Sequence, residues 1–265
     1  MNKVYLLRHG QTPYNVFESD ILKKLNLGPN DDKLAYYIRF MKNDNLVDAG
    51  LTEFGKIDTL KKCEQYEQQI KGIKYVIVSP CNRALETTRL FFNSKENNQI
   101  KFIVHPDLRT VLESQYDIPL RVKENMQEYQ EYDFSRVKRL YDQYGFLWFL
   151  HDLFQPNKKK GVIDRLEKLD LKTDKETAYA LLDIMKEQSP VMMEERLDIY
   201  HRLVCFKKWL GEFIREKELK DEQVCLVAHS TIFKILTAKT FDNQYNESNY
   251  ADLKNSELYE HSMFL

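Results

Sequence analysis

Glycine, proline and cysteine are scarce in this sequence of 265 residues, which contains 8 glycines, 7 prolines and 4 cysteines. So little glycine and proline argues against disordered, collagen-like or linker-rich architectures. The cysteines lie far apart, without a CxxC or Cys/His ligand spacing, so neither disulfides nor a structural zinc site is expected. This use of cysteine fits a reducing, cytoplasmic location.

Long hydrophobic runs and an excess of one charge are also lacking. The apolar run Val4–Leu7 is shorter than the roughly 7–15 residues of a signal-peptide core, and no run approaches the ~18 residues needed to span a bilayer. The 40 Lys and Arg residues nearly balance 41 Asp and Glu, so neither nucleic acid nor an anionic membrane is the expected partner. The 43% of hydrophobic residues is enough for a substantial core in one large domain, 1–265.

Four short apolar runs predict buried strands, at Val4–Leu7, Tyr75–Val78, Phe102–Val104 and Val224–Ala228. Their continuous rather than alternating apolar character is typical of a sheet covered on both faces. Helical patterns lie between them, at about 52–70, 79–92, 193–216 and 230–241. Strands that alternate with helices predict an α/β fold with a mostly parallel sheet.

The stretch from about 115 to 190 differs from the rest of the chain. It is highly charged, rich in Tyr and Phe, and contains the helix-like segments Phe134–Leu150 and Thr173–Glu187 without a clear strand. We interpret it as a helical insertion or cap on the α/β core, and we expect substrate specificity to reside there.

Basic residues follow three of the predicted strands. Arg8 and His9 end the first, Arg83 lies shortly after the second, and His229 ends the last. Ligands of open α/β sheets bind beyond the carboxyl ends of the strands, so these side chains are expected around one point. A guanidinium group matches phosphate oxygens, and a neutral imidazole can attack phosphorus. The pattern predicts phosphoryl transfer through histidine, with no metal needed.

Four sequence blocks closely resemble the signatures of the histidine phosphatase superfamily, in its phosphoglycerate mutase-like branch. They are LLRHGQTPYN at 6–15, DAGLTEFG at 48–55, VSPCNRALETT at 78–88 and VAHS at 227–230. The resemblance implies a three-layer α/β/α sandwich and no metal or organic cofactor. It also implies that His9 is the phosphorylated nucleophile, and that the phosphate pocket is lined by Arg8, Thr12, Asn15, Arg83 and His229.

The general acid is the point at which the sequence departs from this family. The family's usual Glu, which protonates the leaving oxygen, corresponds to Thr110 here. Glu113 is the nearest carboxylate that could take the role, and Asp117 is the alternative. If Glu113 is only a solvated loop residue, the leaving group would be a good one, such as a phenol, or the enzyme would be slow.

The sequence therefore predicts a phosphatase that hydrolyses a small phosphomonoester through a phosphohistidine. One alternative is a phosphoglycerate-type mutase, which needs further basic residues near the pocket; the segment His105–Pro119 offers only Arg109. Another is a non-catalytic module that binds a phosphorylated ligand, supported only by the displaced acid. The sequence leaves the physiological substrate and the oligomeric state open.

Overall fold

A six-stranded sheet forms the centre of the molecule in a computed structural model that describes residues 2–28, 43–92, 99–151, 160–188 and 194–263. Its strand order is β4-β3-β2-β5-β1-β8. Strand β8 runs antiparallel to β1, and the other neighbours pair in parallel, as predicted. The strands are β1 (Asn2–Arg8), β2 (Tyr75–Val78), β3 (Lys101–Val104), β4 (Tyr132–Asp133), β5 (Val224–Ala228) and β8 (Leu258–Met263). Two further short strands, β6 (Thr240–Phe241) and β7 (Glu247–Ser248), pair with each other.

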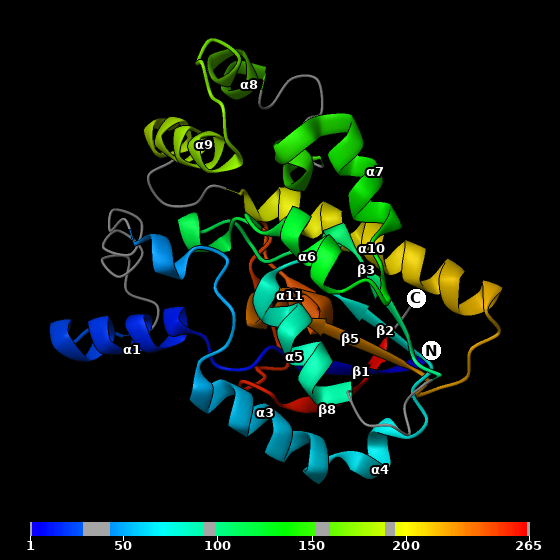
Figure 1. The fold of residues 1–265 in the computed structure, drawn as a ribbon. Coiled ribbons are helices and arrows are strands. Elements are labelled where there is room, and N and C mark those ends of the chain that lie inside the picture. Colours follow the sequence, from blue (N-terminus) through cyan, green and yellow to red (C-terminus); the bar gives the residue numbers. More distant parts are fainter. Residues whose placement is uncertain (1, 29–42, 93–98, 152–159, 189–193, 264–265) are drawn as a thin grey trace.

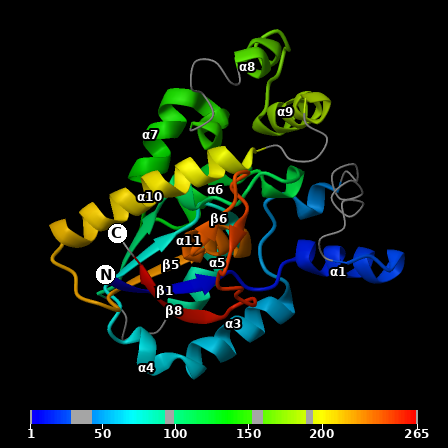
Figure 2. The ribbon, with the colours of Figure 1, turned by 180° about the vertical axis from the view of Figure 1, so that it is seen from behind.

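Helices cover both faces of this sheet (Figures 1 and 2). The α-helices are α1 (Pro13–Leu25), α3 (Glu53–Gln65), α4 (Glu67–Ile70), α5 (Asn82–Phe92), α6 (Val122–Glu128), α7 (Ser135–Tyr144), α8 (Lys160–Leu166), α9 (Asp174–Gln188), α10 (Arg196–Glu216) and α11 (Ser230–Thr237). Short 3₁₀ helices are η1 (Asp44–Leu46), η3 (Pro106–Leu108), η4 (Gln115–Asp117) and η5 (Gly145–Leu150).

Alternate residues of the strands pack into two separate hydrophobic cores, one on each face of the sheet. Val4 and Leu6 of β1 pack with residues of α10 and α11 on one face. Leu7 faces the opposite way and packs in the core that includes residues of α5. Side chains on successive strand positions point to opposite faces, so a strand buried on both sides must be apolar throughout. The predicted three-layer α/β/α sandwich is confirmed.

The predicted insertion packs onto the same core as α5. Val122 of α6, Val137 of α7 and Leu181 of α9 all belong to that core. One element of it is not helical: β4 pairs in parallel with β3 at the edge of the sheet, where the rings of Phe102 and Tyr132 stack at 4.6 Å. Helices α8 and α9 lie farthest from the sheet (Figure 1).

Two predicted helices start or face differently in the structure. Helix α5 begins at Asn82 and not at Ser79. The carboxylate of Asp48 accepts a hydrogen bond from the Asn82 N–H at 3.0 Å and so satisfies a backbone donor in the first turn of the helix. On α10, which begins at Arg196, Val204 is 45% exposed although its spacing suggests a core position. The predicted start of that helix, at Met193, lies outside the described residues.

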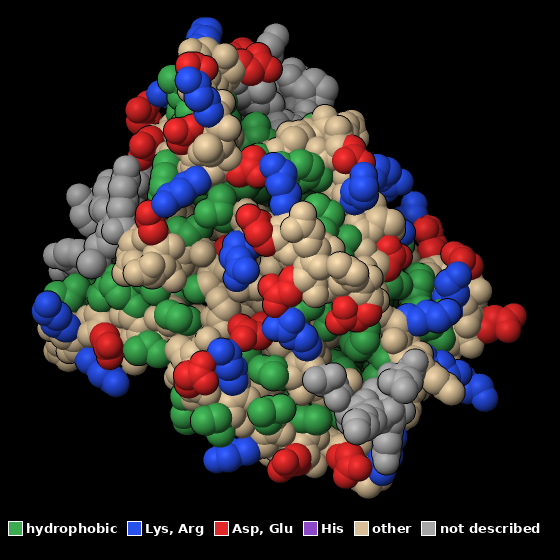
Figure 3. Space-filling view, viewed as in Figure 1, with side chains coloured by type: hydrophobic (Ala, Val, Ile, Leu, Met, Phe, Trp, Pro, Cys, Tyr) green, Lys and Arg blue, Asp and Glu red, His purple; other side chains and the backbone are tan. Residues whose placement is uncertain are grey.

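The surface carries charges of both signs. On the face seen in Figure 3, acidic and basic side chains are interspersed rather than gathered into one patch. Phe54 and Ile57 of α3 are exposed apolar side chains, at 64% and 53%. None of the helices within the described ranges is long and apolar enough to cross a bilayer.

Candidate active site

The predicted site residues come together in one cleft of about 620 Å³ beyond the carboxyl ends of the strands. The register of β1 and β5 pairs Arg8 with Ala228, which places the next residues, His9 and His229, side by side. The centroids of these two rings are 5.1 Å apart. Seven predicted residues line the cleft, namely Arg8, His9, Thr12, Asn15, Arg83, Glu113 and His229.

His9 is a buried imidazole that is held in one tautomer. Its Nδ1 lies 2.8 Å from the carbonyl oxygen of Gly10, which can only accept, so Nδ1 carries the proton. The lone pair is therefore on Nε2. Burial holds the pKa of His9 well below its usual value, and the charges of Arg83 and Arg8 lower it further. A neutral imidazole with an available lone pair is the form that can attack phosphorus.

The loop after His9 is fixed by the second sequence block. The carbonyl oxygen of Gln11 accepts a hydrogen bond from the Thr52 N–H at 2.9 Å. Gly55 packs so closely that a Cβ there would lie 2.3 Å from this same oxygen. The Gly10 N–H in turn donates to Thr87 Oγ1 at 2.9 Å. These contacts explain why a Thr and a Gly at this spacing accompany the first block.

His229 and Arg83 form a second, connected unit. Arg83 Nε donates to His229 Nδ1 at 3.3 Å, so the proton of this imidazole is on Nε2, which lies 2.8 Å from Ser79 Oγ. Burial holds the pKa of His229 well below its usual value, and the charge of Arg83 lowers it further. Both histidines of the cleft are therefore neutral at pH 7.

Asp117 holds the other end of Arg83. Its Oδ1 accepts from Arg83 Nη2 at 3.3 Å, and its Oδ2 accepts from the backbone N–H and the hydroxyl of Ser114, both at 3.0 Å. Burial raises the pKa of Asp117, while the charge of Arg83 opposes the rise. With both oxygens engaged, Asp117 is suited to orient the guanidinium group.

Arg8 has an unused donor at the cleft. Its Nη1 donates to the carbonyl oxygen of Leu253 at 2.8 Å, whereas its buried Nε meets no acceptor among the described residues. Buried polar groups are nearly always satisfied, and a phosphate oxygen would satisfy this one. The feature points to an anion as the ligand of the cleft.

Thr12 and Asn15 form the start of α1. The Thr12 hydroxyl caps the helix by accepting the Asn15 N–H at 3.2 Å, and Asn15 Oδ1 accepts from both the N–H and the hydroxyl of Thr12 at 3.1 Å. Since Oδ1 is occupied, the amide NH₂ of Asn15 is the group left to donate to a ligand. Both residues lie where the sequence predicts them.

A segment from the far end of the chain supports the first block. Asn255 Nδ2 donates to the backbone carbonyl of His9 at 2.9 Å. The Ser256 N–H donates to the carbonyl of Arg8 at 3.1 Å, next to the contact between Arg8 and Leu253. Residues 253–256 thus hold Arg8 and the backbone of His9 in place, a role that no pattern in the sequence indicates.

The residues considered for the position of the general acid all line the cleft. Thr110 and Asp117 line the cleft together with Glu113, which is exposed. Sequence reasoning missed Glu18, a half-buried carboxylate of α1 that also lines it. The available signal was helical spacing, because Glu18 lies three residues after Asn15 and so on the same side of the helix.

Arg109, the residue considered for a mutase substrate, points into the protein. It is fully buried and its Nη1 and Nη2 donate to the two carboxylate oxygens of Glu194 at 2.8 and 2.9 Å. Arg202 donates to Glu194 as well, at 3.1 and 3.0 Å. This buried ion-pair triad holds the loop after β3 against the start of α10.

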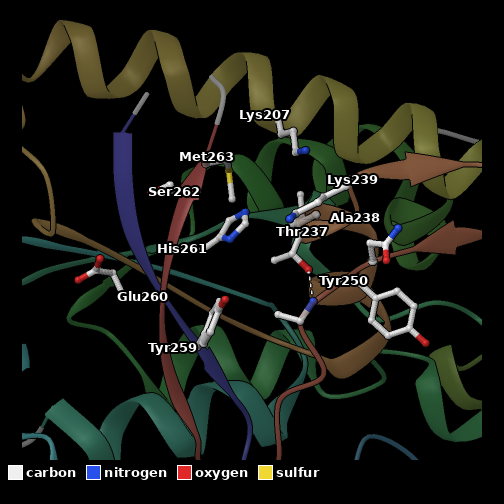
Figure 4. A pocket seen from close by; sticks show the side chains of 13 residues that line it. Lys207, Thr237, Ala238, Lys239, Tyr250, Tyr259, Glu260, His261, Ser262 and Met263 are labelled. Atoms are coloured by element: carbon white, nitrogen blue, oxygen red, sulfur yellow. Dashed lines mark hydrogen bonds between the residues drawn. The ribbon is translucent and has the colours of Figure 1, made fainter.

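A larger cavity of about 890 Å³ lies elsewhere, between α10, α11 and β8. Figure 4 shows Lys207, Lys239 and His261 around it, with the hydrogen bond from Ala251 to Thr237 on its wall. None of the predicted site residues lines this cavity. Among the residues with described positions, no three His, Cys, Asp or Glu side chains are grouped to hold a metal ion.

No family model and no curated protein matches this chain. Among solved structures, it is similar to a mycobacterial glucosyl-3-phosphoglycerate phosphatase, with 16% identity, a TM-score of 0.49, and 99% of this chain and 91% of that chain covered. A phosphoglycerate mutase from Bacillus anthracis is similar at 15% identity and a TM-score of 0.46, covering 98% and 87%. The ecdysone phosphate phosphatase of Bombyx mori is similar at 15% identity and a TM-score of 0.44, covering 98% and 88%.

Proposed function

We propose that this chain is a phosphatase of the histidine phosphatase superfamily, and that it hydrolyses a small phosphomonoester through a phosphohistidine at His9. The observation that carries the proposal is the neutral imidazole of His9, with its lone pair on Nε2, in one cleft with Arg8, Arg83 and His229. The four sequence blocks that resemble this superfamily supply these same residues.

In the first step, His9 Nε2 attacks phosphorus while the bond from phosphorus to the leaving oxygen breaks. Charge on the transferring group is stabilised by the guanidinium groups of Arg8 and Arg83 and by the amide of Asn15. Asp117 keeps Arg83 in place. The leaving oxygen takes a proton from a carboxylic acid of the cleft, for which the sequence predicts Glu113 or Asp117.

In the second step, water attacks the phosphohistidine, the N–P bond breaks, and phosphate and neutral His9 are regenerated. Hydrolysis is favoured over mutase chemistry because the cations other than Arg8 and Arg83 that could hold a second anionic group are each paired with a carboxylate. Arg109 is paired with Glu194 inside the protein. At the rim, Arg196 lies 3.0 Å from Glu247, and Lys234 lies 3.2 Å from Asp252.

The test is replacement of His9. We expect His9→Asn to abolish hydrolysis of p-nitrophenyl phosphate and to remove an acid-labile phosphoenzyme that the wild type forms. His201→Asn is the matched control, since His201 is exposed on α10 and does not line the cleft. Retained turnover in His9→Asn would exclude the mechanism. Robust interconversion of phosphoglycerates with a bisphosphate primer would instead establish a mutase, and phosphate binding without any turnover by the wild type would establish a binding module.

A further inference from the structure

Three of the five carboxylates that line the cleft bind the cations Arg83, Arg196 and Lys234. Asp117 binds Arg83 and Ser114 through both of its oxygens. Glu247 is paired with Arg196, and Asp252 with Lys234. The partners of these three carboxylates fix their side chains in place, so none of the three is suited to turn toward a leaving oxygen. The two other carboxylates that line the cleft are Glu113 and Glu18.

These two carboxylates have different surroundings. Glu113 is an exposed side chain of the cleft wall. Glu18 is half-buried on the inner face of α1, one helical turn beyond Tyr14 and Asn15, which line the cleft with it. Within the described part of the chain it makes no hydrogen bond and no ion pair. It is therefore a carboxyl group of the cleft wall that is not bound by any residue of the described ranges.

The environment of Glu18 also favours its protonated form. Burial raises the pKa of Glu18, and the negative charge of Asp117 raises it further, whereas the charge of Arg8 opposes the rise. Tyr14, on the same face of α1, is a neutral phenol whose pKa is raised well above its usual value by burial and then by Glu18. A general acid reacts from its protonated form, and a raised pKa of the carboxyl group favours that form.

We propose that Glu18 is the general acid of this enzyme, in place of the carboxylate that Thr110 lacks. The assignment rests on the proposed phosphatase function. As the His9 Nε2–phosphorus bond forms and the phosphorus–oxygen bond breaks, the leaving oxygen takes the proton of the Glu18 carboxyl. The resulting carboxylate then takes a proton from the attacking water while the N–P bond breaks, which restores protonated Glu18 and releases phosphate.

The experiment compares Glu18→Gln with Glu113→Gln on two substrates, by following leaving-group release in the first turnover. An alkyl phosphate such as glycerol phosphate needs a proton on its leaving oxygen, whereas p-nitrophenyl phosphate does not. We expect Glu18→Gln to slow the first turnover of the alkyl phosphate by about 10²–10⁴-fold and that of the aryl phosphate by less than about threefold. We expect Glu113→Gln to show no such selectivity.

First-turnover measurements also distinguish failure of the general-acid role of Glu18 from failure of the proposed phosphatase function. The near-normal aryl burst in Glu18→Gln verifies that the variant is folded, and its phosphoenzyme should accumulate because the second step lacks its base. Equal slowing of both substrates would overturn the assignment and leave Glu18 a positioning role. Selectivity in Glu113→Gln with none in Glu18→Gln would move the acid to Glu113. Absence of a phosphoenzyme in the wild type would instead refute the phosphatase mechanism itself.

Discussion

Replacing Gly55 by alanine tests whether the second sequence block supports the loop that follows His9. A Cβ at this position would lie 2.3 Å from the carbonyl oxygen and 3.0 Å from the backbone nitrogen of Gln11. Both are backbone atoms, so the clash cannot be relieved by rotating a side chain. Either α3 or the loop that follows His9 has to move by several tenths of an ångström or more.

The cost of that movement is the sum of three effects. Overpacking of this kind costs about 1–3 kcal/mol. Moving Gln11 also strains the hydrogen bond that its carbonyl accepts from Thr52, which contributes about 1 kcal/mol. The higher helix propensity of alanine offsets at most about 1 kcal/mol of this loss. We therefore expect Gly55→Ala to lower the free energy of unfolding by about 2 kcal/mol.

The assay is urea denaturation together with kcat/KM for p-nitrophenyl phosphate. Gly72→Ala is the matched control, because a Cβ there meets nothing within 4 Å and the backbone needs no positive φ. We expect the control to change the free energy of unfolding by less than about 1 kcal/mol and to leave activity unchanged. Activity of Gly55→Ala should fall at least tenfold, since misplacing a reacting group by about 1 Å costs up to about 10²-fold. If both variants match the wild type, the close approach of Gly55 does not position the His9 loop.

Two further predictions concern charge. Arg83→Ala should lower kcat/KM for an aryl phosphate by well over tenfold, because it removes a buried guanidinium that contacts His229 and Asp117. A tenfold loss corresponds to about 1.4 kcal/mol of transition-state stabilisation. A smaller loss in steady-state kinetics would show that Arg83 does not stabilise the transferring group. Acid should destabilise the fold through His105, since burial lowers the pKa of His105 from 6.5 to about 4. The unfolded chain takes up this proton as the pH falls through 6.5 and the native state does not, so up to about 3 kcal/mol of stability is lost between pH 6.5 and 4. His105→Phe keeps an aromatic ring against Phe206 and Trp209. In urea melts at several pH values, this variant should lose less free energy of unfolding between pH 6.5 and 4 than the wild type. An equal loss in both proteins would show that His105 is not the group responsible.

The central sheet could be predicted from the sequence because each buried strand is a continuous apolar run. Tyr75–Val78 and Val224–Ala228 have the predicted bounds, and their parallel pairing follows from the helices between them. Strand β4 could not be predicted, because two residues carry no periodicity and their extended form depends on pairing with β3. The start of α5 was missed for a similar reason, since its stabilising carboxylate, Asp48, lies 34 residues away in the sequence.

The cleft residues that follow strands in short motifs could be predicted from the sequence, whereas single cleft residues on helices could not. Arg8, His9 and His229 sit directly at strand ends, so the sheet topology alone brings them together. Glu18 has no motif around it. Helical spacing puts it on the same side of α1 as Asn15, but only the direction of α1 in the fold turns that side toward the cleft. The partners of Arg109 were equally hidden, because Glu194 is 85 residues farther along the chain.

The dependence of Arg8 and His9 on residues 253–256 sets an order of events during synthesis. The contacts from Leu253 and Asn255 reach back across 245 and 246 residues of sequence. On the ribosome, Arg8 and His9 are therefore made about 245 residues before the segment that supports their backbone, and they lack these contacts until residues 253–256 have emerged from the exit tunnel. A partly made chain can pair β1 with its neighbours only after β5 appears, and it completes the cleft later still. Chains that stop before residue 253 therefore lack the contacts that hold the backbone of Arg8 and His9 in the cleft.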